Sequence, residues 1–301
     1  MVIVPLCQRR ALARIEAMIP RTAIALTLIC CARVGCSQRD ALDDILERGE
    51  LEVVTRNSPT TYFLDRDDAS GFEYALADLF AKELGVELKV RTAFSLADIF
   101  RTLQRAEADF AAAGLTLTGQ REMLFPHSLP YYRLRPQVIY KAGKLRPRQV
   151  EELAGREIAV LEGSSHLESL QALQRGGAED LLWREIPGAD SMDLLEEVDS
   201  GRIPLAIIDS NEFRVQQSLY PRLKVAFDLG SEQDMVWYLS PAADNSRLLQ
   251  AIDAFLAHLQ DNGTLDRLLE EHFGHTNGVS RIGSHTFNRN MRNKLPQHRA
   301  Q

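Results

Sequence analysis

The chain has 301 residues, of which 45% are hydrophobic and 26% charged, a composition typical of an ordinary globular protein. This composition excludes collagen-like, low-complexity and mostly disordered proteins. The formal net charge is -7, but both ends of the chain are basic. Residues 37–274 carry 25 Lys and Arg against 41 Asp and Glu, a formal charge of -16. So acidic a body argues against a nucleic-acid-binding surface, which needs basic side chains to neutralise phosphates.

The first 36 residues have the layout of an export signal. Several arginines precede an apolar run at residues 22–32, which is too short to span a bilayer comfortably. All four cysteines lie in this segment, so the remaining 265 residues contain no disulfide framework and no cysteine metal site. The sequence RVGC at residues 33–36 resembles the lipobox of bacterial lipoproteins, except that Arg33 stands where the pattern has an apolar residue. We predict export, with lipidation of Cys36 or ordinary cleavage nearby as alternatives, and with Met1 or Met18 as the start.

From Leu51 onward, short apolar runs alternate with amphipathic helical patterns, which is typical of an α/β fold with mainly parallel sheets. In the first half of residues 37–274, strand-like runs alternate with helical patterns until a polar stretch at residues 141–149, after which the same alternation begins again. The restart predicts two α/β lobes. The expected strands are 51–55, 86–91, 108–113, 157–161, 205–209, 223–227 and 235–239, and the expected helices are 72–84, 245–260 and two that begin at Ser95 and Ser165.

The loop at residues 114–121 follows a buried strand and carries two hydroxyls and an arginine. The planar fork of Arg121 matches a carboxylate, and Thr116 and Thr118 add hydroxyl donors. Gly114 opens this loop. The alternative is a solvated or capping arginine.

A second candidate is the turn at residues 162–168, where Gly163, Ser164 and Ser165 join a strand to a helix. Free backbone N–H groups at such a turn bind anions, assisted by the helix dipole. A capping box formed by Ser165 and Glu168 is the alternative explanation. The turn can also cap the helix and bind an anion at the same time.

Asp209 ends the apolar strand 205–209, where α/β proteins place ligand-binding residues. Its carboxylate could receive a ligand ammonium, or it could cap the following helix. Glu73 is a weaker candidate of the same kind at the start of the first long helix. His272 and His275 are three residues apart but have no visible third ligand, so we expect no metal site. Nucleotide, phosphate-loop and serine-hydrolase motifs are missing, and no cofactor is expected.

Taken together, these residues resemble the family-3 solute-binding proteins of bacteria, periplasmic amino-acid receptors with two α/β lobes joined by a hinge. The resemblance covers residues 45–274. It implies that Arg121 clamps a ligand α-carboxylate with help from the turn at Gly163, and that Asp209 binds the α-amino group. The matching stretches are LEVVTRNSPTTYFL, GFEYALADLF, ADFAAAGLTLTGQR, PYY, AVLEGSSH and LAIIDS.

Within that family the sequence resembles one branch most, the non-catalytic N-terminal module of the membrane-bound lytic murein transglycosylases F, which are outer-membrane enzymes. The shared pieces include NSP at 57–59, GSSH at 163–166, WYL at 237–239 and HFGH at 272–275. Members of that branch continue through a linker, here matched by Thr286-Phe287, into a lysozyme-like catalytic domain. Because the chain ends at Gln301, we expect no peptidoglycan cleavage from it.

The predicted organisation is an export signal at 1–36, a first lobe from 45–140 plus 232–274, a second lobe at 141–231 and a basic tail at 275–301. Crossovers between lobes are expected near 140–144 and 228–233.

The predicted function is an exported module that closes over an amino acid or a cell-wall peptide fragment, in a sensing or regulatory role, with Tyr62 as an aromatic wall of the cleft. Two alternatives stay open. One is a truncated lytic murein transglycosylase of the F type acting in peptidoglycan turnover, and the other is a structural partner with a degenerate pocket. We expect a periplasmic monomer with a small-molecule ligand, no nucleic acid, and an association with the outer membrane or peptidoglycan.

Overall fold

The computed structural model describes residues 40–66 and 68–274. The predicted export signal, Cys36, His275 and the predicted basic tail lie outside the described residues. Within the described part, two separate β-sheets each have helices packed on both faces, as an alternating strand and helix pattern requires. The structure therefore confirms the α/β, two-lobe fold class that the sequence predicts.

The first sheet has four strands in the order β13-β5-β1-β4. The strand β1 (Glu50–Arg56) runs parallel to β4 (Glu87–Ala93) and β5 (Phe110–Ala111), while β13 (Tyr238–Leu239) is antiparallel to β5. Alternation of side chains along these strands separates two apolar clusters, one on each face. For example, Val53 belongs to one cluster and its neighbour Val54 to the other.

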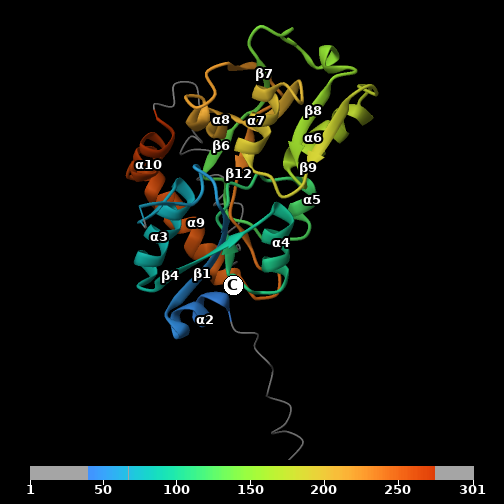
Figure 1. Cartoon of the computed structure of the whole chain (residues 1–301). Helices are drawn as coiled ribbons and strands as arrows, with labels where there is room; N and C mark the ends of the chain where they lie inside the picture. Colours follow the sequence, from blue (N-terminus) through green and yellow to red (C-terminus); the bar gives the residue numbers. More distant parts are fainter. Residues whose placement is uncertain (1–39, 67, 275–301) are drawn as a thin grey trace, which may run out of the picture. The chain divides into compact units, whose positions relative to one another are not determined.

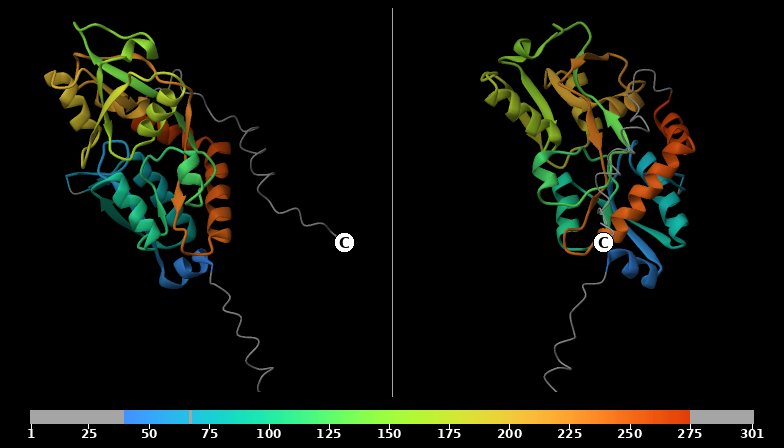
Figure 2. Two further views of the ribbon diagram at one scale, coloured as in Figure 1. Left: turned by 90° about the vertical axis from the view of Figure 1, so that its right-hand side faces the viewer. Right: turned by 180° about the vertical axis from the view of Figure 1, so that it is seen from behind.

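Helices cover this first sheet unequally, as Figures 1 and 2 show. The larger cluster contains residues of α2 (Ala41–Arg48), α3 (Phe72–Leu84), α9 (Ser246–Asp261) and α10 (Thr264–Phe273). At its centre the rings of Phe110 and Trp237 stack with centroids 4.6 Å apart. The opposite face is covered by α4 (Leu96–Gln104), whose Ser95 cap accepts a hydrogen bond from the Asp98 backbone. The helix expected to begin at Ser95 is thus confirmed, with Ser95 as its N-cap residue.

The second sheet has five strands in the order β11-β7-β10-β8-β9. Only β7 (Pro136–Lys141) is antiparallel to both of its neighbours, which are β10 (Leu205–Asp209) and β11 (Leu223–Asp228). The other two strands are β8 (Glu157–Leu161) and β9 (Leu182–Ile186). Apolar residues of α7 (Ser191–Ser200) and α8 (Ser210–Gln216) pack on one face, while α6 (Ser165–Arg175) and the short 3-10 helix η1 (Val150–Leu153) cover the other.

Two chain passages connect the sheets through a short antiparallel pair, β6 (Tyr132–Leu134) with β12 (Gln233–Met235). Because β7 already begins at Pro136, the first passage lies near Arg135, before the predicted 140–144. The second lies between Asp228 and Gln233, within the predicted range. The lobe boundaries themselves stay a prediction.

Smaller elements complete the described chain. A hairpin of β2 (Phe63–Asp65) and β3 (Asp68–Ser70) precedes α3, and the four-residue helix α5 (Gly119–Glu122) follows β5. The expected strand 235–239 is two strands in different sheets, because its residues pair first with β6 and then with β5. No helix in the described residues is both long and apolar enough to cross a membrane.

Candidate functional site

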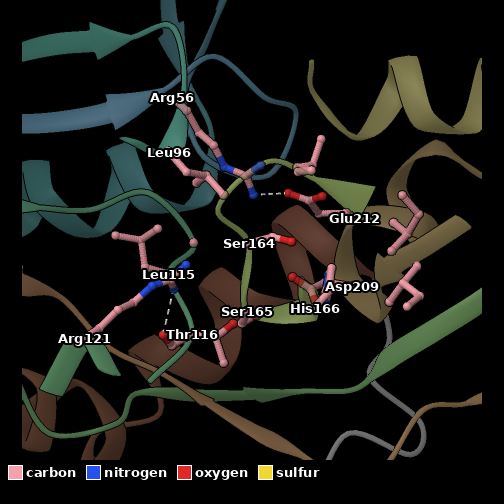
Figure 3. Close-up of a pocket in the computed structure, with 14 residues that line it drawn as sticks. Arg56, Leu96, Leu115, Thr116, Arg121, Ser164, Ser165, His166, Asp209 and Glu212 are labelled. Carbon is pink, nitrogen blue, oxygen red and sulfur yellow. Dashed lines mark hydrogen bonds and ion pairs between the residues drawn. The ribbon is translucent and has the colours of Figure 1, made fainter. Parts of the chain in front are cut away.

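One pocket gathers residues that follow the carboxyl ends of strands in both sheets (Figure 3). Arg56 ends β1, Thr116 follows β5, Ser164 follows β8 and Asp209 ends β10. The carboxyl edges of parallel strands are where α/β proteins bind ligands. The pocket therefore brings together the three segments that the sequence singles out.

Arg121 is positioned by the short helix α5. The side chain of Thr118 caps this helix and accepts a hydrogen bond from the Arg121 backbone N–H at 3.3 Å. The guanidinium then donates to the carbonyl of Thr116 at 3.1 Å and to the carbonyl of Gly163, in the other lobe, at 3.0 Å. It also lies 5.0 Å from the centre of the Phe100 ring. Burial lowers the pKa of Arg121, yet a guanidinium titrates so high that the group keeps its charge.

The turn between β8 and α6 leaves one side-chain hydroxyl without a hydrogen-bond partner. Gly163 has φ 70°, a left-handed conformation that a residue with a side chain adopts at a cost. The N-cap of α6 is Ser164, with no side-chain cap bond, so the predicted Ser165 and Glu168 capping box is wrong. Glu168 accepts instead from the Thr118 hydroxyl at 3.0 Å, across the lobes. The Ser164 hydroxyl is buried without a hydrogen-bond partner.

Asp209 is buried at the junction of β10 and α8, where it is the N-cap residue but makes no side-chain cap bond. Burial, reinforced by the nearby charge of Glu212, raises the pKa of Asp209 to about 8. The buried His166 lies opposite, with 3.4 Å between its Nε2 and Asp209 Oδ1, and burial lowers the pKa of His166 to about 4. Both side chains are therefore mainly uncharged at neutral pH, and their contact is not an ion pair. Asp209 Oδ1 and His166 Nδ1 have no hydrogen-bond partner.

Two further charged residues line the pocket, Arg56 and Glu212, which form an ion pair between the lobes. Both side chains are largely buried, and Arg56 Nε also donates to the carbonyl of Ala113 at 3.1 Å. Sequence reasoning missed this pair and did not select His166. The position of Arg56 at the carboxyl end of the first strand was a usable signal. Glu212 carried none, because acidic residues are common in the first turn of a helix.

Glu73 and Tyr62 do not line this pocket. Glu73 is fully buried and accepts hydrogen bonds from Tyr131 Oη, from Trp237 Nε1 at 2.9 Å and from the backbone N–H of Gly114 at 3.0 Å. Burial raises its pKa. Through Gly114 it holds the loop that carries Thr116. Tyr62 packs edge-on against the ring of Tyr74, with centroids 5.7 Å apart. The prediction that either side chain touches a ligand stays a prediction.

The pocket is nearly closed. Its cavity volume is about 30 Å³, room for about two water molecules, whereas ligand pockets measure a few hundred Å³. Contacts between the lobes fill the space, since Arg121 reaches Gly163 and Arg56 reaches Glu212. A ligand of amino-acid size can enter only if the lobes move apart.

Relatives of known sequence match most of this chain. The chain is 44% identical over 268 residues to the membrane-bound lytic murein transglycosylase F of Ectopseudomonas mendocina, an alignment covering 88% of this chain and 54% of that protein. It is 42% identical over 260 residues to the protein of the same name from Pseudomonas fluorescens, covering 85% and 53%. The chain thus spans about half the length of the curated relatives it matches.

Solved structures resemble the fold closely. A mutant of ArgBP from T. maritima matches with a TM-score of 0.69 at 24% identity, covering 77% of this chain and 99% of that one. An ancestral arginine-binding protein bound to arginine matches with a TM-score of 0.68 at 25% identity, covering 75% and 99%. The family described as bacterial extracellular solute-binding proteins, family 3, matches residues 51–275. With this match and the two-lobe fold, the chain belongs to the bacterial extracellular solute-binding proteins of family 3.

Proposed function

We propose that this protein is a receptor for the zwitterionic headgroup of an amino acid, or of the peptide part of a cell-wall fragment, which it encloses by closing its two lobes. Arg121, with Thr116 beside it, binds the carboxylate. The turn of Gly163, Ser164 and Ser165 adds donors to the same group, and Asp209 receives the ammonium.

A set of buried polar atoms without partners carries this proposal. Buried polar groups in proteins are nearly always hydrogen-bonded, so partnerless ones call for an explanation. In the described residues, Ser164 Oγ, His166 Nδ1 and Asp209 Oδ1 all lack hydrogen-bond partners, and all three residues line the pocket that contains Arg121. A bound headgroup supplies the missing acceptor and donors.

The electrostatics of the pocket also fit a zwitterion. Arg121 is a buried cation whose guanidinium donates to two neutral carbonyls, so a carboxylate offers it a stronger acceptor. Burial raises the pKa of Asp209 despite the nearby charges of Arg56 and Arg121, and an ammonium in contact with the carboxylate favours its ionised form. The ancestral arginine-binding protein is a 25% identical structure solved with an amino acid bound.

The test is isothermal calorimetry of the full chain against the common amino acids and a panel of muropeptides. Arg121→Ala should weaken binding by about tenfold to a hundredfold, because a hydrogen bond to a charged group contributes roughly 1.5 to 3 kcal/mol. Arg101→Ala is the matched control, since Arg101 is exposed on α4 and pairs with Asp98. No binding of any compound, or equal loss in both variants, would contradict the proposal.

The names of the relatives favour a second candidate, a role in peptidoglycan turnover as part of a lytic murein transglycosylase of the F type. In that case the receptor senses wall fragments and regulates an enzyme. Zymography on peptidoglycan with the 301-residue chain tests whether the chain has lytic activity of its own, which cleared bands would show. For either role we propose a location outside the cytoplasm, in line with the family, and an association with the outer membrane or the wall.

A further inference from the structure

We propose that the ion pair of Arg56 and Glu212 determines which amino-acid side chains the pocket accepts, and that it excludes charged ones. This inference rests on the proposed function and deepens it. The pair lies in the same pocket as Arg121 and Asp209 but is not needed to bind a headgroup. It therefore marks the part of the pocket that remains for the ligand side chain.

Each charge of the pair is already satisfied. Arg56 Nη2 meets Glu212 Oε1, and only 14% and 5% of the two side chains are exposed. The Ala113 carbonyl accepts from Arg56 Nε, and the Thr60 hydroxyl lies 3.4 Å from Glu212 Oε1 as a donor. When the lobes close over a ligand, a charged ligand side chain finds a partner only by keeping this pair apart, which leaves one member of the pair buried without a counterion.

The other surfaces of the pocket are apolar. Apart from Gly114, the headgroup residues, His166 and this pair, the lining residues are aliphatic: Leu96, Leu115, Leu161, Ile207 and Ile208. Such walls favour an uncharged side chain of modest size. The ion pair would give specificity by lowering the affinity for charged ligands, while adding little to the affinity for an uncharged one.

The pair also predicts how the preference changes when one member is removed. Arg56→Ala leaves the Glu212 carboxylate buried with no cation bound to it, so a ligand with a guanidinium or ammonium side chain becomes its partner. Glu212→Gln leaves Arg56 as a free donor, and a ligand with a carboxylate side chain becomes preferred. A pair that only holds the lobes together predicts instead an equal change for every ligand.

The experiment measures the affinity of the full chain for arginine, leucine and glutamate, which share one headgroup and differ in side-chain charge. We expect wild type to prefer leucine. Arg56→Ala should raise the ratio of arginine to leucine affinity at least tenfold, and Glu212→Gln should raise the ratio of glutamate to leucine by a similar factor. Arg202→Ala, which removes a surface pair with Glu197, is the matched control and should move neither ratio.

A second measurement does not depend on the headgroup. Methylguanidinium at millimolar concentration should raise the melting temperature of Arg56→Ala by filling the vacated cation position, but not that of wild type or of the double variant with Glu212→Gln. Unchanged affinity ratios, or a melting temperature of Arg56→Ala that methylguanidinium does not raise above that of the double variant, would overturn the inference. Wild type that binds no amino acid, beside an Arg56→Ala variant that responds to methylguanidinium, would refute the proposed function alone.

Discussion

Glu73 supports the loop beneath the pocket, since its carboxylate accepts a hydrogen bond from the backbone N–H of Gly114. Replacing Glu73 with Ala leaves three buried donors without an acceptor: the Gly114 N–H, the Tyr131 hydroxyl and Trp237 Nε1. Each unsatisfied donor costs about 1 to 3 kcal/mol, and some of this is returned because a buried carboxylate is no longer desolvated. Glu73→Ala should therefore lower the free energy of unfolding by about 3 kcal/mol.

Urea unfolding followed by far-ultraviolet circular dichroism measures this loss without relying on the fluorescence of Trp237. Asp78→Ala on the same helix is the matched control. It removes only an exposed pair with Lys82, and such pairs contribute little to stability. If Glu73→Ala costs less than about 1 kcal/mol and abolishes amino-acid binding, the carboxylate serves the ligand rather than the core, and the reasoning fails.

Two more predictions concern Asp209 and Gly71. The pKa of Asp209 in the folded protein is raised to about 8, so the stability that its protonated form retains is lost as the pH rises through that value. The pKa of His166 is lowered to about 4, so His166 opposes this trend only below about pH 6.5, the ordinary pKa of histidine. The free energy of unfolding should thus fall by up to about 2 kcal/mol between pH 6.5 and 8 in urea titrations, and a fall that persists in Asp209→Asn would contradict the assignment. Gly71→Ala should destabilise the protein more than Gly85→Ala, at the other end of α3. Both glycines have positive φ, but of the two only Gly71 would bring a Cβ against the backbone, 2.3 Å from the Thr61 carbonyl oxygen. Equal melting temperatures of the two variants would show that the loop can move to accept the Cβ.

The fold was largely predictable because its signals are local. The strands at residues 157–161 and 205–209 are buried on both faces, so each reads as a short unbroken apolar run with clear ends. The helix at 72–84 has an apolar period and ends at Gly85, which adopts the left-handed conformation of a helix C-cap. The expected strand at 235–239 was harder, because its two halves join different sheets and nothing local marks the change.

The site was predictable where a residue stands beside a strand end, and not where its role comes from the other lobe. Arg121 and Asp209 follow buried strands, and the structure places both in the pocket. Glu168 forms a reasonable capping box with Ser165 in sequence, but a hydroxyl 50 residues away takes its carboxylate. Glu212 likewise acquires its partner, Arg56, 156 residues away in the chain. Such contacts depend on how the lobes meet, which residue order alone does not encode.

Because of these contacts, the affinity for a ligand depends on the difference in free energy between the form closed on itself and the form closed over the ligand. Without ligand, the Arg121 guanidinium binds the carbonyls of Thr116 and Gly163, and Asp209 keeps a proton. A headgroup must break the bond to Gly163 and remove that proton before its own contacts contribute, so the self-closed form competes with it. A ligand shifts a conformational equilibrium only by its differential affinity for the two states. Contacts between the lobes outside the pocket, such as the bond from Thr118 to Glu168, stabilise the self-closed form. Weakening one that the ligand-bound form does not keep should therefore strengthen binding, because the open form that admits the ligand becomes more populated.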